Sequence, residues 1–120
     1  MPALVRLRRL ALPLALAVVA AACSRGDPRV ANLSVGISKD SAITAMGGER
    51  PSRIDPYLTG GQYIEAMYYI RPGGEPAAGE SVPDREQTPV VAVNGILTGW
   101  GWAHWDSVAA ANNIPVSPKD

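Results

Sequence analysis

The sequence predicts a small α+β domain, in which one or two short helices pack on a three-stranded antiparallel sheet and a helical turn follows near the C-terminus. Three observations predict this class. The segment after Ser38 carries a one-sided apolar stripe of helical period. Residues 63–70 alternate as a strand does, and an Asn94-Gly95 pair separates two apolar runs that can form a hairpin.

The first predicted helix lies within residues 39–47. Ser38 is a suitable N-cap, and Asp40 lies in the first turn, where a negative charge is favourable to the helix dipole. Ala42 belongs to the apolar stripe, and Gly47 suits the position just after a helix end. Because so short a helix is marginal on its own in water, it must pack on another element.

The first predicted strand covers residues 63–70. One set of alternate side chains is apolar, whereas the other contains Glu65, which marks the second set as the more solvated face. Residues 71–87 are rich in Gly, Pro, Glu and Ser, and this composition predicts a long mobile loop.

The second and third predicted strands are residues 88–93 and 96–102. A two-residue turn at Asn94-Gly95 sorts their side chains onto two faces. One face receives Val90, Ala92, Leu97, Gly99 and Gly101, and the other receives Val91, Val93, Ile96, Thr98, Trp100 and Trp102. The first face is small, and the helix at 39–47 is expected to lie over its residues Val90, Ala92 and Leu97.

A short C-terminal helix is predicted after Trp105. Asp106 or Ser107 can cap it, and Asn112-Asn113 ends it. Residues 114–120 contain two prolines and two terminal charges, which predicts a flexible tail.

Cys23 follows a segment that is typical of an export signal. Three arginines precede an apolar run at residues 10–22, which is shorter than the about 20 residues that span a bilayer. A cysteine directly behind small side chains resembles the lipobox of bacterial lipoproteins, in which the thiol receives a diacylglycerol and the new amino terminus a further acyl chain such as palmitate. The sequence therefore predicts a lipoprotein signal peptide at 1–22 and lipidation of Cys23. The alternative is an ordinary secretory signal with a cysteine near the new terminus.

Cleavage before Cys23 leaves a lipidated tether at 23–29, a single domain at 30–113 and the tail. The mature chain has eight Lys and Arg against eleven Asp and Glu, a net charge of −3. This balance argues against nucleic acid or an anionic lipid surface as the partner. The membrane contact is then made by the acyl chains, each methylene contributing about 0.8 kcal/mol.

No catalytic or metal-binding pattern stands out. His104, Asp106 and Ser107 are the residue types of a hydrolytic triad, but close neighbours in one stretch do not normally form the required chain of hydrogen bonds. Ser38 has no accompanying base, and one histidine without a carboxylate pair does not make a metal site. We therefore predict a protein that is not an enzyme and needs no cofactor or metal.

Trp100, Trp102, His104 and Trp105 form the best candidate for an interaction surface. Tryptophan is enriched at the energetic centres of interfaces, and three of the seven aromatic residues fall within this short stretch. The alternative is that these rings form the core of a small domain that has no phenylalanine. A mixed arrangement, with one ring buried and another at a rim, is also open.

Two short patterns resemble a known family, the SmpA/OmlA small lipoproteins, which are BamE-like components of the outer-membrane β-barrel assembly machine. The patterns are Gly36-Ile37-Ser38 followed by Ala42, Met46 and Gly47, and Thr88-Pro89-Val90-Val91 followed by Asn94-Gly95 and Gly99-Trp100-Gly101. The resemblance implies two short helices, the first from residues 27–33, followed by a three-stranded antiparallel sheet.

These features together predict a non-catalytic lipoprotein on the periplasmic face of the outer membrane. It would act as a scaffold or protein-interaction module in outer-membrane assembly or maintenance, with an envelope protein rather than nucleic acid as partner. Ser24 fits this location, because aspartate at that position is the usual inner-membrane retention signal in such lipoproteins. The alternative is a carbohydrate- or peptidoglycan-binding module with the tryptophans as stacking platforms. An open aromatic face would favour sugar, whereas an apolar patch rimmed by charge would favour protein.

Overall fold

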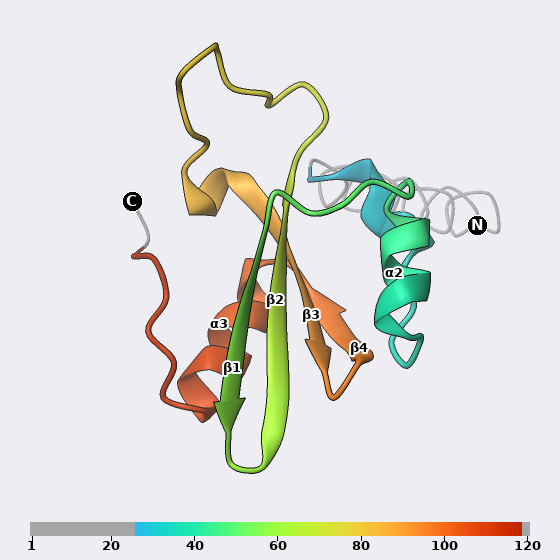
Figure 1. Cartoon of the computed structure of the whole chain (residues 1–120), viewed down its shortest axis with the longest axis vertical. Coiled ribbons are helices and arrows are strands. Elements are labelled where there is room, and N and C mark those ends of the chain that lie inside the picture. The colour runs from blue at the N-terminus through green and yellow to red at the C-terminus, as the bar shows by residue number, and fades with distance from the viewer. Residues whose placement is uncertain (1–25, 119–120) are drawn as a thin grey trace, which may run out of the picture.

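The computed structural model describes residues 26–118 as an antiparallel sheet with helices on both faces (Figure 1). In chain order the elements are the 3-10 helix η1 (Pro28–Asn32), α2 (Lys39–Ala45), β1 (Arg53–Thr59), β2 (Gln62–Ile70), the 3-10 turn η2 (Asp84–Glu86), β3 (Gln87–Val93), β4 (Ile96–Trp100) and α3 (Trp102–Ala111). The strands lie side by side in the order β1-β2-β3-β4. The predicted α+β class is confirmed, but the sheet has four strands rather than three.

The additional strand is β1, at one edge of the sheet. It pairs with β2 through a Gly60-Gly61 turn, in which both glycines have positive φ, 57° and 76°. Pro56 lies in the middle of β1 opposite Glu65. Proline interrupts a strand pattern in the sequence and is tolerated at an edge, where a missing N–H does not break the ladder.

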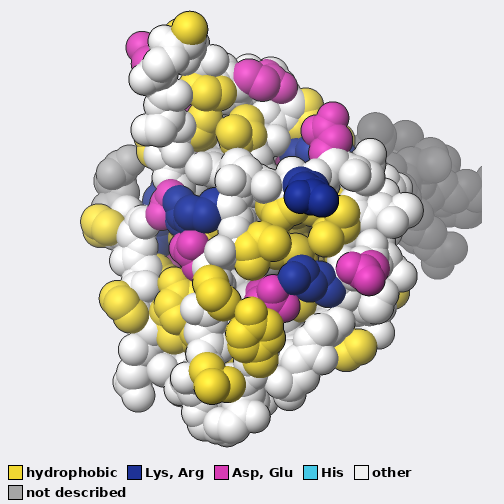
Figure 2. Space-filling model, in the orientation of Figure 1, with side chains coloured by type: hydrophobic (Ala, Val, Ile, Leu, Met, Phe, Trp, Pro, Cys, Tyr) yellow, Lys and Arg dark blue, Asp and Glu magenta, His cyan; other side chains and the backbone are white. Residues whose placement is uncertain are grey.

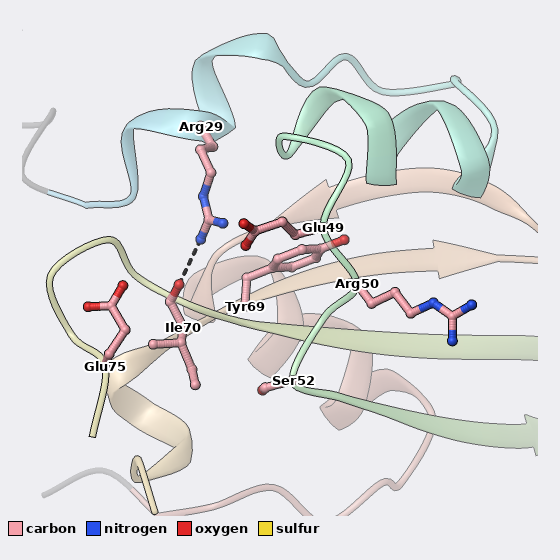
Figure 3. Close-up of a pocket in the computed structure, with 7 residues that line it drawn as sticks. All are labelled: Arg29, Glu49, Arg50, Ser52, Tyr69, Ile70 and Glu75. Atoms are coloured by element: carbon pink, nitrogen blue, oxygen red, sulfur yellow. Dashed lines mark hydrogen bonds between the residues drawn. The ribbon is translucent and has the colours of Figure 1, made fainter. Parts of the chain in front are cut away.

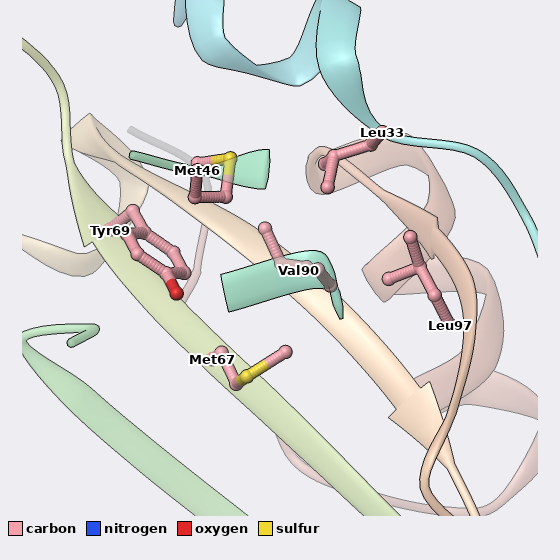
Figure 4. Packing of buried hydrophobic residues seen from close by; sticks show 7 residues of the cluster. Leu33, Met46, Met67, Tyr69, Val90 and Leu97 are labelled. Carbon is pink, nitrogen blue, oxygen red and sulfur yellow. The ribbon is translucent and has the colours of Figure 1, made fainter. Parts of the chain in front are cut away.

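Two apolar clusters hold the domain together, one on each face of the sheet. On one face η1 and α2 cover the cluster drawn in Figure 4, which contains Leu33, Ala42, Met46, Met67, Tyr69, Val90 and Leu97. On the other face α3 covers Ile64, Ala66, Tyr68 and Val91, to which it adds Trp105 and Ala109. β2 is therefore buried on both sides.

The prediction that the Glu65 face of β2 is solvated is wrong. Glu65 is 6% exposed, because Met67 and Tyr69 on the same face lie in the cluster beneath α2. Its carboxylate accepts a 2.6 Å hydrogen bond from Nζ of Lys39, the first residue of α2. This ion pair compensates for the burial of the charge.

The N-cap predicted for α2 is confirmed. The Ser38 hydroxyl accepts a hydrogen bond from the Ser41 amide at 3.1 Å. The chain just before the helix also binds β4, since the Gly36 amide donates to the Leu97 carbonyl and the Leu97 amide donates to the Ile37 carbonyl. These bonds cover the β4 edge of the sheet.

The β3–β4 hairpin has the predicted turn but not the predicted register throughout. Beyond the turn, Ala92 pairs with Leu97 as expected, but Val91 pairs with Gly99, so Thr98 is an extra residue in a bulge. α2 lies over Val90 and Leu97 as predicted, whereas Ala92, the third residue predicted beneath it, is buried but does not belong to this cluster. The faces assigned to Gly99 and Trp100 are wrong, because the bulge exchanges them: Trp100 packs against the cluster beneath α2, and Gly99 lies beneath His104.

The C-terminal helix is confirmed but begins earlier than predicted, at Trp102, within the stretch expected to be strand. Gly101 makes this possible, because its φ of 86° turns the chain out of β4. The prediction of a flexible tail at 114–120 is wrong at least as far as Ser117, because this segment packs on the domain. Ile114 is 8% exposed, and the Ser117 carbonyl accepts a 2.6 Å hydrogen bond from Arg85.

The folded domain starts at Asp27, inside the segment predicted as a tether. Asp27 is 3% exposed, and its carboxylate accepts hydrogen bonds from Nε and Nη2 of Arg29 at 2.9 and 2.6 Å. Burial would raise the pKa of Asp27, but the hydrogen bonds from Arg29 outweigh it and lower the pKa. The predicted tether at 23–29 is too long, because nothing in this short polar segment indicates that Asp27 and Arg29 form a buried pair.

Candidate interaction surface

The four residues predicted as an interaction surface do not lie on one surface. Trp100 packs on the α2 face, while Trp102, His104 and Trp105 belong to α3 on the opposite face. Trp105 is fully buried, its Nε1 donates to the Tyr68 hydroxyl at 3.1 Å, and Trp105 is therefore a core residue.

Trp102 is half-buried and connects the start of α3 to the start of β3. Its Nε1 donates to the Gln87 carbonyl at 2.9 Å, and the Arg85 guanidinium lies 4.1 Å from the centre of its ring system. Arg85 also forms two hydrogen bonds with the carboxylate of Asp106, at 2.9 and 3.0 Å. These contacts occupy the polar atom and one face of the Trp102 ring, so it does not offer an open platform.

His104 lies against the sheet rather than in solvent. Its Nε2 is 3.0 Å from the Thr98 hydroxyl, which donates to the Val91 carbonyl, so we assign the proton to Nε2 as the donor to Thr98. Burial lowers the pKa of His104. A Cβ on Gly99 would lie 2.7 Å from its ring, so the bulge places a glycine where only a glycine fits. Asp106 is held by Arg85 and not by this histidine.

Cavities at the surface of the described residues lie near two of the elements that carry the predicted site and the N-terminal segment. One, of about 310 Å³, lies beside α3 and includes Ile64, Val93 and His104 in its lining. Another, of about 250 Å³, lies at the end of β2, where the Arg29 guanidinium is 5.4 Å from the centre of the Tyr69 ring (Figure 3).

The second cavity offers no free cationic group at its centre. Arg29 is already bound to Asp27 and donates to the Ile70 carbonyl at 2.8 Å, while Arg50 points away from the other lining side chains (Figure 3). Glu49 points toward Arg29 without forming an ion pair within 4 Å in the part of the chain that the structure describes. The lining shows no arrangement of nucleophile and base.

The most prominent exposed apolar group lies outside the residues that the sequence predicts as an interaction surface. It consists of Leu58, Tyr63 and Ile54, with exposed fractions of 81%, 44% and 37%, together with Pro56. The strand register places Leu58 opposite Tyr63 and Ile54 opposite Met67, so all four side chains lie on the α2 face. We call these four residues the β1 strip.

The β1 strip is exposed because α2 covers only part of its face. α2 packs on η1 and β4, at the far side of the sheet from β1 (Figure 1). Since a helix with its side chains is about 10 Å thick, α2 projects from the sheet beside the β1 strip. Figure 2 shows apolar side chains on this side of the molecule, with charged ones among them. The Lys39–Glu65 ion pair lies between α2 and the strip.

Comparison with known proteins gives no match: no family model, curated protein or solved structure is significantly similar to this chain. The resemblance to the BamE-like lipoproteins therefore stays a prediction. The predicted signal peptide and Cys23 lie outside the described residues. Within residues 26–118, no helix is long and apolar enough to cross a membrane, and no group of three His, Cys, Asp or Glu residues could hold a metal ion.

Proposed function

We propose that the protein is a lipid-anchored interaction module of the bacterial cell envelope. Acyl chains on Cys23 hold it in the outer membrane, facing the periplasm, and the β1 strip binds another envelope protein in outer-membrane assembly or maintenance. The observation that carries the binding function is the strip itself. Apolar side chains grouped on the uncovered part of a sheet, with Leu58 81% exposed, are typical of a protein-binding surface.

The sugar-binding alternative is less well supported. It needs tryptophan rings on an accessible platform, but Trp105 is fully buried, and Trp100 and Trp102 pack on opposite faces of the sheet. The β1 strip is instead an apolar surface with the Lys39–Glu65 ion pair at its rim. This combination favours a protein partner.

Pro56 favours binding to the face of the sheet over addition of a strand to its edge. Thr59 and Gln62 flank a two-residue turn, so they form a hydrogen-bonded pair, and the backbone groups of Leu58, Pro56 and Ile54 point away from β2. An added strand would find no N–H at Pro56, in the middle of this row. The partner is therefore expected to pack its side chains onto the strip.

Leu58→Asp is expected to abolish binding of the partner without unfolding the domain, because the side chain that it replaces is 81% exposed. A central interface residue contributes about 2 kcal/mol or more, which is about a 30-fold loss of affinity. The measurement is quantitative mass spectrometry of proteins that copurify in detergent with the tagged chain after crosslinking of intact cells. Thermal unfolding of each variant is recorded alongside.

Val35→Asp is the matched control, because Val35 is 67% exposed and lies outside the strip. An envelope protein that is retained with Val35→Asp and lost with Leu58→Asp would support the proposal. Equal recovery from both variants would contradict it. Recovery of glycan fragments in place of a protein would favour the sugar-binding alternative.

A further inference from the structure

The chain between the proposed lipid and the folded domain is very short. Only Ser24, Arg25 and Gly26 separate Cys23 from the buried Asp27. Four residue steps reach at most about 14 Å even when fully extended. If Cys23 lies at the membrane surface, Asp27 lies within that distance of it.

We infer that the domain stands on the bilayer at the end of the sheet where β2 ends and β3 begins, with both hairpin turns pointing away from the membrane. The inference rests on the proposed lipidation of Cys23 and adds the orientation in which the β1 strip meets its partner. The lipid headgroups are then in contact with the surface around Asp27.

Hydrogen bonds fix Asp27 to this end of the sheet. Its carboxylate is 3.4 Å from the Thr88 hydroxyl, near the start of β3, and its partner Arg29 donates to the carbonyl of Ile70, the last residue of β2, at 2.8 Å. The loop at residues 71–83 leaves from the same end, and the two hairpin turns lie at the other (Figure 1). Moving Asp27 away from this end of the sheet would break its hydrogen bond with Thr88 and the bond from Arg29 to Ile70.

The opposite end of the sheet is too far from Asp27 to rest on the membrane. β2 runs from Gln62 to Ile70, and at about 3.3 Å per residue its ends are about 26 Å apart. That length exceeds the about 14 Å reach of the tether. The turn at Gly60-Gly61 therefore points away from the bilayer.

Neither flat face of the domain suits the membrane. Thr88 pairs with Tyr69 on the α2 face, so Asp27, which is bound to Thr88, lies on this face too. A domain lying on α3 would therefore place both α3 and the sheet, about 10 Å each, between Asp27 and the bilayer. On the other face, α2 projects from the sheet beside the β1 strip and exposes the polar Asp40 and Thr44. A flat bilayer would meet these side chains and not the apolar strip.

The upright orientation leaves the β1 strip open to the side. Leu58 pairs with Tyr63, seven residues from Ile70, so it lies about 23 Å from the membrane end of β2. A partner must present its complementary apolar surface at about this height. The partner that we infer is therefore a protein with a periplasmic part, rather than the lipid surface itself.

Fluorescence quenching in vesicles tests the orientation. Ala77→Cys in the loop and Gln62→Cys at the distal turn each add one thiol at an exposed position, and the only native cysteine is blocked when Cys23 is acylated. Each variant is purified from host membranes, labelled with a thiol-reactive dye and placed in phosphatidylethanolamine–phosphatidylglycerol vesicles that carry nitroxide headgroups. We expect at least fivefold stronger quenching at position 77 than at position 62.

A lengthened tether is the control. A twelve-residue Gly/Ser insertion between Ser24 and Arg25 adds a root-mean-square distance of about 20 Å and should remove most of the difference. Equal quenching without the insertion, or stronger quenching at position 62, would overturn the inference. Failure of lipidation gives a different result, because the protein would not float with the vesicles and neither dye would be quenched. That result would refute the lipidation of Cys23, and the inferred orientation with it.

Discussion

Trp105→Ala is expected to lower the free energy of unfolding by about 3–5 kcal/mol, the range for loss of a buried large aromatic side chain. Trp105 is fully buried between α3 and the sheet, where its ring centre is 5.8 Å from that of Tyr57. The substitution also leaves the Tyr68 hydroxyl, itself buried, without the Trp105 Nε1 donor. Both losses act on the cluster that attaches α3 to the sheet.

Urea unfolding followed by circular dichroism measures this effect. Tyr63→Ala is the matched control, since it also removes an aromatic ring but from a side chain that is 44% exposed, and we expect it to cost about 1 kcal/mol. A loss below about 1.5 kcal/mol for Trp105→Ala, or equal losses for the two variants, would show that the ring is not a core residue.

Cys23→Ser is expected to abolish lipidation and processing completely. A hydroxyl at position 23 cannot replace the thiolate as the nucleophile that forms the thioether. The precursor should keep residues 1–22 and incorporate no alkyne-palmitate. Gel mobility, intact mass and palmitate labelling in the native host measure the three consequences.

Ser24→Ala is the control for Cys23→Ser, because it changes the adjacent residue and leaves the thiol in place. It should be processed and labelled as the unaltered chain is. Cleavage to the same mature size in Cys23→Ser, with no palmitate label in either the variant or the unaltered chain, would refute the lipoprotein proposal and favour an ordinary secretory signal. The β1 strip would then have to bind its partner without a lipid anchor.

Local signals in the sequence predicted several elements of the fold. The Ser38 cap and the Asn94-Gly95 turn depend on side chains within a few residues, and both are present in the structure. β1 was missed because Pro56 breaks its pattern, although Gly60-Gly61 was an available turn signal. The burial of Glu65 was missed because it depends on α2, from a distant part of the chain.

The candidate surface was harder to predict than the fold. The tryptophans are neighbours in sequence, but the bulge at Thr98 and the turn at Gly101 send Trp100 and Trp105 to opposite faces. Gly99 inside the predicted strand was an available sign of a bulge, but a glycine there equally fits close approach of another backbone, so it did not fix the register. The β1 strip could have been found from the alternation of Ile54, Pro56 and Leu58 once the strand was recognised, but its exposure depends on where α2 lies.

The most direct test of the account is photocrosslinking in intact cells from position 58. A benzoylphenylalanine replaces Leu58 in the strip, and the same residue replaces Ala110, an exposed position of α3 on the other face, as the control. We expect a discrete adduct with an envelope protein from position 58 that is absent from position 110 and is lost in Cys23→Ser. No adduct from position 58, or the same adducts from both positions, would contradict it.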